Sequence, residues 1–189
     1  MPKLPRTITL LIDSREQRPL LFPEILDWYQ TRGGPVHTFT VRTKVVALPA
    51  GDYALDGYDD AIIERKGSLR ELRNNFLSDD YRRAQAAFTK LTEATENPYL
   101  LLDIDLAELL TPSIEVEKPE IILDAFLDFA QASGVKLLIV GGCKRPVARC
   151  RLGGFVIRLL LSHCMRSIVG PIDISSIVDA IVGGNINGP

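Results

Sequence analysis

The residues best suited to chemistry lie in one short stretch, Gly51 to Lys66, which reads GDYALDGYDDAIIERK. Asp52 and Glu64 belong to runs typical of two adjacent strands, and Lys66 follows Glu64 by two positions. Side chains two residues apart on a strand point to the same face. Two carboxylates beside an ammonium are poorly suited to a core. They are well suited to holding a hard divalent cation and a water against a phosphodiester.

Hydrolysis of a phosphodiester requires a nucleophilic water, neutralised charge on the phosphoryl oxygens and a stabilised leaving oxygen. Magnesium held by one or two carboxylates supplies much of this. A lysine alongside can orient or deprotonate the water, or stabilise the developing charge. The spacing alone is common, and a surface cross-strand salt pair between Glu64 and Lys66 is the alternative interpretation.

The flanking residues make the pattern more specific. IDSREQR at Ile12 to Arg18, GDY at Gly51 to Tyr53 and IERK at Ile63 to Lys66 occur in this order, and YRRAQ follows at Tyr81 to Gln85. Together these motifs resemble the XPF-type (ERCC4-like) nuclease domain, a branch of the PD-(D/E)XK nucleases found in structure-specific DNA endonucleases. The resemblance covers about the first two-thirds of the chain. It implies an α/β fold in which a central mixed β-sheet is flanked by helices, as in restriction endonucleases.

The resemblance implies a role for each residue around the two carboxylates. Asp52 and Glu64 would be metal ligands for Mg²⁺ or Mn²⁺, and Asp13 would join them as a further acidic ligand. Lys66 would be the catalytic lysine. Arg65 would add a metal-binding backbone carbonyl to the catalytic group, while its side chain braces the site or meets a phosphate.

The first motif adds residues beside this group. Arg15 and Arg18 are expected on phosphates and Glu16 in support of the acidic cluster; a local surface ion pair of Arg15 and Glu16 is the alternative. The family usually has an acidic residue four positions after the motif lysine, where this chain has Arg70. Glu71 is adjacent, and it either substitutes for that residue or serves a helix cap.

Further DNA contacts are expected from basic side chains on the helices that follow the motif, because such side chains can track a DNA backbone. The alternative for each of them is a solvated helical face. These residues are Arg70, Arg73, Arg82, Arg83 and Lys90.

Charge is unevenly distributed along the 189 residues, although the formal net charge is only −2. Glu93 to Asp128 holds ten acidic residues and one basic residue, whereas Phe129 to Ile172 holds seven basic residues and no acidic one. The basic region can meet phosphates, or the two regions can simply face each other or water. The net charge therefore does not indicate binding to nucleic acid, whereas the basic region is compatible with it.

Hydrophobic periodicity and turn residues predict strands that alternate with helices. Strands are expected at Ile8–Ile12, Val36–Leu48, Asp52–Leu55, Ala61–Glu64, Tyr99–Ile104 and Val135–Val140. Helices are expected at Pro23–Thr31, Ser68–Phe76, Asp80–Glu96, Glu120–Ser133, Pro146–His163 with a break at Gly153-Gly154 left open, and Ile174–Val182. This order predicts an α/β fold with a mixed sheet, in agreement with the fold that the resemblance implies.

We expect residues 1–189 to form a single nuclease domain without the helix-hairpin-helix module that often accompanies this family. The implied partners are DNA and either a second copy of the chain or a helix-hairpin-helix protein. The apolar helix Phe155 to Leu161 is expected in the core or in such a dimer. Three cysteines without CxxC spacing, no secretion signal and no bilayer-length segment predict an intracellular protein of the cytoplasm or nucleoid, with no membrane partner.

The leading functional hypothesis is a metal-dependent DNA endonuclease that cuts branched, flapped or single-strand/double-strand junction DNA. The rival is a catalytically inactive nuclease fold that binds DNA or scaffolds a partner. Inactive relatives typically lack the acidic cluster or the lysine, and this chain retains Asp13, Asp52, Glu64 and Lys66. A restriction-like or prophage recombination nuclease would share the chemistry and differ in DNA geometry.

Overall fold

Short β-branched and apolar runs form the seven strands of one mixed sheet in the computed structural model, which describes residues 5–28, 37–77, 81–113 and 116–169. The order across the sheet is β2-β3-β1-β4-β5-β6-β7. The strands are β1 (Thr7–Asp13), β2 (Ile25–Trp28), β3 (His37–Val46), β4 (Tyr53–Leu55), β5 (Tyr58–Lys66), β6 (Asn97–Leu102) and β7 (Lys136–Ile139). The sheet confirms the predicted α/β class with a central mixed sheet.

Strand direction brings the motif residues to one edge of this sheet. β1 runs parallel to β3, and β5, β6 and β7 are parallel to one another, while β4 is antiparallel to both β1 and β5. The carboxyl ends of β1 and β5 therefore meet at the edge where β4 begins. Asp13 ends β1, Asp52 directly precedes β4 and Lys66 ends β5, so this edge collects the residues that the motifs predict.

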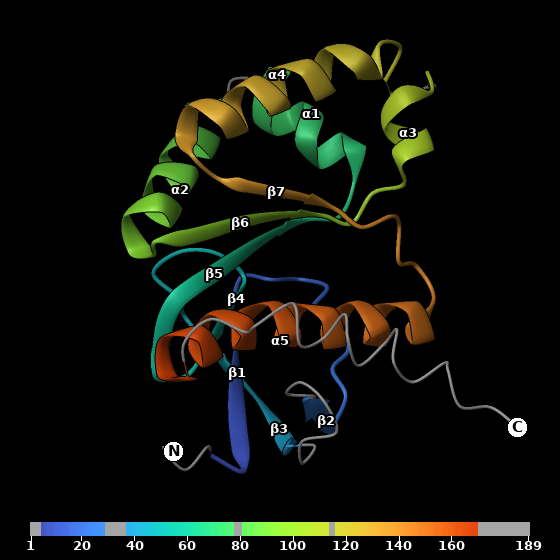
Figure 1. The fold of residues 1–189 in the computed structure, drawn as a ribbon. Helices are drawn as coiled ribbons and strands as arrows, with labels where there is room; N and C mark the ends of the chain where they lie inside the picture. The colour runs from blue at the N-terminus through green and yellow to red at the C-terminus, as the bar shows by residue number, and fades with distance from the viewer. Residues whose placement is uncertain (1–4, 29–36, 78–80, 114–115, 170–189) are drawn as a thin grey trace, which may run out of the picture.

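Helices cover both faces of the sheet (Figure 1). One face carries α1 (Leu69–Leu77), α2 (Tyr81–Ala94), α3 (Leu106–Leu110) and α4 (Pro119–Ser133), and the other carries α5 (Pro146–Val169). The expected end of α4 is confirmed: Gly134 adopts a left-handed conformation at φ 72°, which glycine tolerates without steric cost. Within the described ranges, no helix combines the length and apolar character that crossing a bilayer requires.

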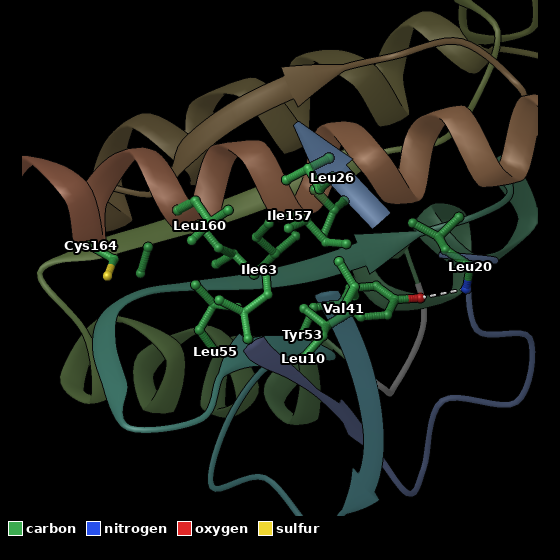
Figure 2. Packing of buried hydrophobic residues seen from close by; sticks show 14 of the residues in the cluster. Leu10, Leu20, Leu26, Val41, Tyr53, Leu55, Ile63, Ile157, Leu160 and Cys164 are labelled. Carbon is green, nitrogen blue, oxygen red and sulfur yellow. Dashed lines mark hydrogen bonds between the residues drawn. The ribbon is translucent and has the colours of Figure 1, made fainter. Parts of the chain in front are cut away.

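Alternate residues of the strands face two separate apolar layers. On the side of α5, Leu10, Tyr53 and Ile63 belong to one buried cluster with Ile157 and Leu160 (Figure 2). The layer on the other face includes Ile62, Leu72, Phe88, Leu100 and Phe126. Of the two interpretations of the apolar part of α5, core packing is therefore confirmed for its inward side.

The structure corrects one expectation about secondary structure and decides a second point that the sequence left open. Residues Ile25–Trp28, expected within a helix over Pro23–Thr31, form a strand that pairs antiparallel with His37–Thr40. This pairing is non-local, so helical periodicity within the segment could not reveal it. α5 is continuous through Gly153-Gly154, where a break had been left open. The helix expected at Ile174–Val182 lies outside the described residues.

Gly153 marks a close approach between α5 and the segment that leads into β2. A Cβ atom at Gly153 would overlap the carbonyl oxygen of Leu21 and lie 2.9 Å from the ring of Phe22. At the neighbouring Gly154 the nearest packing atom would be Cγ of Pro23, at an ordinary 3.8 Å. Gly153 therefore allows the segment of Leu21 and Phe22 to pack directly on α5, whereas a Cβ atom at Gly154 would fit without a clash.

Substitution of these two glycines is expected to have opposite effects on stability. Gly153→Ala forces a backbone carbonyl to move and is expected to destabilise the protein by about 1–3 kcal/mol. Gly154→Ala restricts the unfolded chain without a clash and is expected to stabilise it by up to about 1 kcal/mol. Urea unfolding of both variants checks this, and equal effects of the two alanines would contradict the close approach.

Candidate active site

Three carboxylate residues stand in one row across adjacent strands. Ile12 pairs with Tyr53, and Tyr53 pairs with Ile63, so the next residues along the row are Asp13, Asp52 and Glu64. Residues opposite each other on an antiparallel pair have Cβ atoms about 4.5–5.5 Å apart and share a face. The register thus brings Asp52 and Glu64 together on the face covered by α1 and α2.

The turn before β4 positions Asp52. Gly51 has φ 69°, in the left-handed region, and a Cβ atom there would overlap the side chain of Ile62. From this turn the Asp52 amide donates to the Ile63 carbonyl at 2.8 Å. The Arg65 amide donates to Asp52 Oδ2 at 2.7 Å. Backbone contacts therefore hold the carboxylate against the end of β5.

Asp52 sits in an environment that opposes its negative charge. Burial and then the negative charge of Glu64 raise the pKa of Asp52 well above its usual range. The amide of Arg65 and the charge of Lys66 act in the opposite direction, but do not offset the increase. Two crowded carboxylates of this kind are stabilised when a cation lies between them.

Lys66 lies beside the carboxylate pair and carries a firmly held proton. Its Nζ atom donates to Glu64 Oε1 at 2.7 Å and to Glu71 Oε1 at 3.2 Å. Burial alone would lower the pKa of Lys66, but the charges of Glu64 and Glu71 outweigh burial and raise that pKa above its usual range. Lys66 is therefore an ammonium that can orient or stabilise negative oxygens.

Glu71 takes part in the helix cap, one of the two roles that the sequence left open for it. Its amide donates to Ser68 Oγ at 3.2 Å, as the predicted N-terminal cap of α1 requires. Its carboxylate also accepts from the Gly67 amide at 3.2 Å and contacts Lys66. The cap is therefore confirmed, and the substitution of Glu71 for an acidic residue at position 70 stays a prediction.

Asp13 has other partners. Arg15 donates through Nε and Nη2 to both oxygens of Asp13 at 2.7 and 2.8 Å, and the Leu48 amide donates to Oδ2 at 2.8 Å. The hydrogen bond from Arg15 lowers the pKa of Asp13. In the part of the chain that is described, no three His, Cys, Asp or Glu side chains are grouped to hold one metal ion. Asp13 thus holds the Arg15 side chain and the Leu48 amide, and its role as a third metal ligand stays a prediction.

Arg65 braces the other face of the sheet edge. Its Nη2 donates to Asp103 Oδ2 at 2.6 Å, and its Nη1 lies 3.8 Å from Glu16 and 3.3 Å from the Arg18 carbonyl. The side chains of Arg65 and Asp103 are 11% and 3% exposed. The bracing role predicted for Arg65 thus matches its contacts, and Glu16 takes part through this guanidinium.

An open pocket of about 1030 Å³ is lined by the three carboxylate residues Asp13, Asp52 and Glu64 and by the pair of Arg65 and Asp103. Of the side chains predicted to contact DNA, Arg15, Arg18, Arg83 and Lys90 line it. Arg70, Arg73 and Arg82 are exposed on α1 and α2 and are not among its lining residues. Their contact with DNA stays a prediction that this pocket does not explain.

Sequence reasoning missed several lining residues of the same pocket. Arg149 lines it from the first turn of α5, Cys143 and Lys144 line it from the segment just before that helix, and Asp103 follows the end of β6. The Cys143 amide donates to Asp103 Oδ1 at 2.7 Å. The basic region after Phe129 and the position of Asp103 at a strand end were the available signals, because ligand sites of open α/β sheets gather at carboxyl ends of strands.

The donor set at this site fits a hard divalent cation. Mg²⁺ commonly uses one or two carboxylates and keeps several waters, and Asp52 and Glu64 supply two. Burial and the negative charge of Glu64 both raise the pKa of Asp52, and a cation between the two carboxylates would offset both effects. The residues present therefore fit Mg²⁺ or Mn²⁺ as a two-carboxylate site.

Comparison with known proteins yields matches in structure only. No protein-family model and no curated protein matches the sequence. Among solved structures, XPF from Aeropyrum pernix matches with a TM-score of 0.52 and 17% identity, over 80% of this chain and 60% of that chain. XPF from Aeropyrum pernix in complex with DNA matches with a TM-score of 0.51 and 15% identity, over 96% of this chain and 76% of that chain.

This chain thus spans less than two-thirds of the length of the first of these structures. At such low identity the likeness concerns the fold and not the activity. The chain therefore has an XPF-like nuclease fold, as its three sequence motifs predict.

Proposed function

We propose that this protein is a Mg²⁺- or Mn²⁺-dependent DNA endonuclease. The observation that carries the proposal is the pair of facing carboxylates, Asp52 and Glu64, beside the ammonium of Lys66 in an open pocket. The XPF-like fold supports it, because a structure of that fold was obtained in complex with DNA. Asp52 and Glu64 would hold the cation, with the Arg65 carbonyl as an additional ligand.

The bound cation would supply a polarised phosphoryl oxygen and a more acidic water. The remaining contributions come from side chains of this chain. Lys66, held protonated between Glu64 and Glu71, would place positive charge on a phosphate or orient a water. Arg65 would keep the end of β5 fixed through its pair with Asp103, so that Glu64 and Lys66 keep their positions.

The substrate we propose is branched, flapped or junction DNA, of the kind that arises in repair and recombination inside the cell. The pocket is open, and basic side chains from three separate segments line it. Arg15 and Arg18 come from the loop after β1, Arg83 and Lys90 from α2, and Lys144 and Arg149 from the segment at and just before the start of α5. Cations on several sides can contact strands that leave a junction in different directions.

Cleavage assays on defined substrates test this proposal. The purified protein is incubated with end-labelled flap, fork, duplex and single-stranded DNA in Mg²⁺, in Mn²⁺ or in a chelator. We expect cleavage in Mg²⁺ or Mn²⁺ that leaves 5′-phosphate and 3′-hydroxyl ends, that is faster on flap and fork DNA than on duplex, and that stops in the chelator. Binding without cleavage in either metal would contradict it and favour the inactive DNA-binding module.

A further inference from the structure

The outer side of α5 carries a stripe of exposed residues that the proposed site does not use. Val147, Arg151, Phe155, Arg158 and Arg166 are all exposed, with Val147 at 65% and Phe155 at 40%. At 100° per residue these positions fall within about 100° of one another around the helix. Most buried positions of the helix, such as Val156 and Leu160, lie on its other side, with Met165 as an exception. These five exposed residues are here named the α5 ridge.

The α5 ridge carries three arginines, Arg151, Arg158 and Arg166. α5 contains no acidic residue. Among the residues that the structure describes, Arg151 and Arg166 form no ion pair. Arg158 donates to the carbonyl oxygen of Asp27 at 2.8 Å, a neutral acceptor, while the Asp27 carboxylate accepts from Thr38. The positive charge of the ridge therefore remains available to a polyanion.

The sheet separates this ridge from the acidic part of the protein. The acidic residues of α3 and α4, which include Glu108, Glu120, Asp124 and Asp128, lie with their helices on the opposite face (Figure 1). The acidic residues of α4 therefore do not lie against the arginines of α5. The two charged regions of the sequence meet just before α5, where Lys144 Nζ lies 3.9 Å from Glu108 Oε2.

We propose that the α5 ridge binds the backbone of a DNA duplex that adjoins the cleavage pocket. This inference rests on the proposed function and adds to it the place where the double-stranded arm of the substrate lies. Arginine side chains that contact phosphates add affinity that does not depend on DNA sequence. Phe155 and Val147 would pack between the arginines against sugar edges of the backbone.

The dimensions and position of the ridge agree with a duplex arm. From Pro146 to Arg166 the helix extends about 30 Å at 1.5 Å per residue, which is close to the length of about 34 Å of one duplex turn. The helix begins at the pocket edge, where Lys144 and Arg149 line the pocket. A duplex on the ridge would thus end where a strand can enter the pocket.

The charge of the ridge argues against a second copy of the chain as its occupant. In a two-fold dimer the same patch meets itself. Arg151, Arg158 and Arg166 would then face the same three arginines of the partner, and α5 offers no carboxylate to pair with them. Like charges brought together at an interface oppose association, whereas a phosphate backbone complements them.

Binding measurements in a metal-free buffer test the α5 ridge. The variant Arg151→Glu/Arg166→Glu is compared with Arg42→Glu/Lys44→Glu, which makes the same charge change on exposed positions of β3. Fluorescence anisotropy is measured on flap substrates whose duplex arm is 5, 10, 15 or 20 base pairs long, over a series of salt concentrations. Thermal unfolding confirms that each variant folds, and Arg151→Gln/Arg166→Gln repeats the test without added negative charge.

Wild type is expected to bind more tightly as the arm grows to about 10 base pairs, one duplex turn, and to level off beyond it. The ridge variant is expected to bind long arms at least about tenfold more weakly and to lose a salt-dependence slope of about 2, since two phosphate contacts are removed. The β3 control is expected to retain most of its affinity. Equal affinities of the ridge variant and wild type on long arms would overturn the proposal.

Two further results separate this inference from the proposed function. Arm-length-dependent binding through the ridge without cleavage in any metal would support the ridge and contradict the endonuclease. Metal-dependent cleavage with arm binding unchanged by the ridge variant would support the endonuclease and overturn the ridge. Sedimentation can also show whether wild type is a dimer. If the ridge variant abolished such a dimer and left DNA binding unchanged, the surface would belong to a second copy of the chain, and the proposed duplex binding would be overturned.

Discussion

Replacing Glu64 with glutamine is expected to lower metal-dependent DNA cleavage by more than about a hundredfold, because even residues that only support a metal ligand cost about 10–100-fold when lost. The amide keeps the shape of the side chain and removes one of the two negative charges on the cation site. Asp52 would then lose the neighbour whose charge raises its pKa. The rate of flap cleavage at saturating Mn²⁺ measures the effect.

Thermal unfolding gives a second readout of the same substitution that does not require activity. Cations that bind only the folded state raise its stability, so Mn²⁺ is expected to raise the Tm of wild type and to leave that of Glu64→Gln nearly unchanged. Lys66 retains its contact with Glu71 in this variant, which preserves the local structure. Asp56→Asn, at the exposed turn of the same hairpin, is the control and should respond to Mn²⁺ as wild type does.

Glu64→Gln protein that cleaves DNA at the wild-type rate would remove Glu64 from the proposed cation site. The same conclusion would follow if Mn²⁺ stabilised that variant as much as wild type. If both proteins were unaffected by the metal, the assignment of a divalent cation to Asp52 and Glu64 would fail as a whole.

Asp103→Asn is expected to destabilise the protein by about 3 kcal/mol, the cost of leaving a buried charge without its partner. Arg65 and Asp103 are joined at 2.6 Å and their side chains are 11% and 3% exposed. The asparagine can still accept the Cys143 amide, so that the change acts mainly on Arg65. Glu16 offers Arg65 only a longer contact of 3.8 Å.

Equilibrium unfolding in urea measures this loss. Asp124→Asn on the exposed side of α4 is the matched control, and a surface change of this kind is expected to stay within about 0.5 kcal/mol. A loss below about 1 kcal/mol for Asp103→Asn would mean that Arg65 finds another acceptor. The brace at the end of β5 would then not depend on Asp103.

Local patterns were enough to predict many of the elements that surround the site. Turn residues Asp56-Gly57 predicted the hairpin of β4 and β5, and Ser68 with Glu71 predicted the start of α1. Each of these depends on contacts within a few residues, which the sequence displays directly. The helix predicted over Pro23–Thr31 was wrong for Ile25–Trp28, since its pairing with β3 is made by residues outside the segment.

The sequence by itself determined that Glu64 and Lys66 share a face, because side chains two residues apart on a strand point the same way. It also placed Asp52 at the start of the neighbouring hairpin strand, and in the structure Asp52 directly precedes β4. Only the tertiary structure decided which partners these and other charged groups have. Asp13 accepts hydrogen bonds from Arg15 and from the Leu48 amide, and Arg65 pairs with Asp103. Basic residues at and just before the start of α5 line the pocket. Such pairs depend on strand register and helix packing between distant segments, which no local spacing encodes.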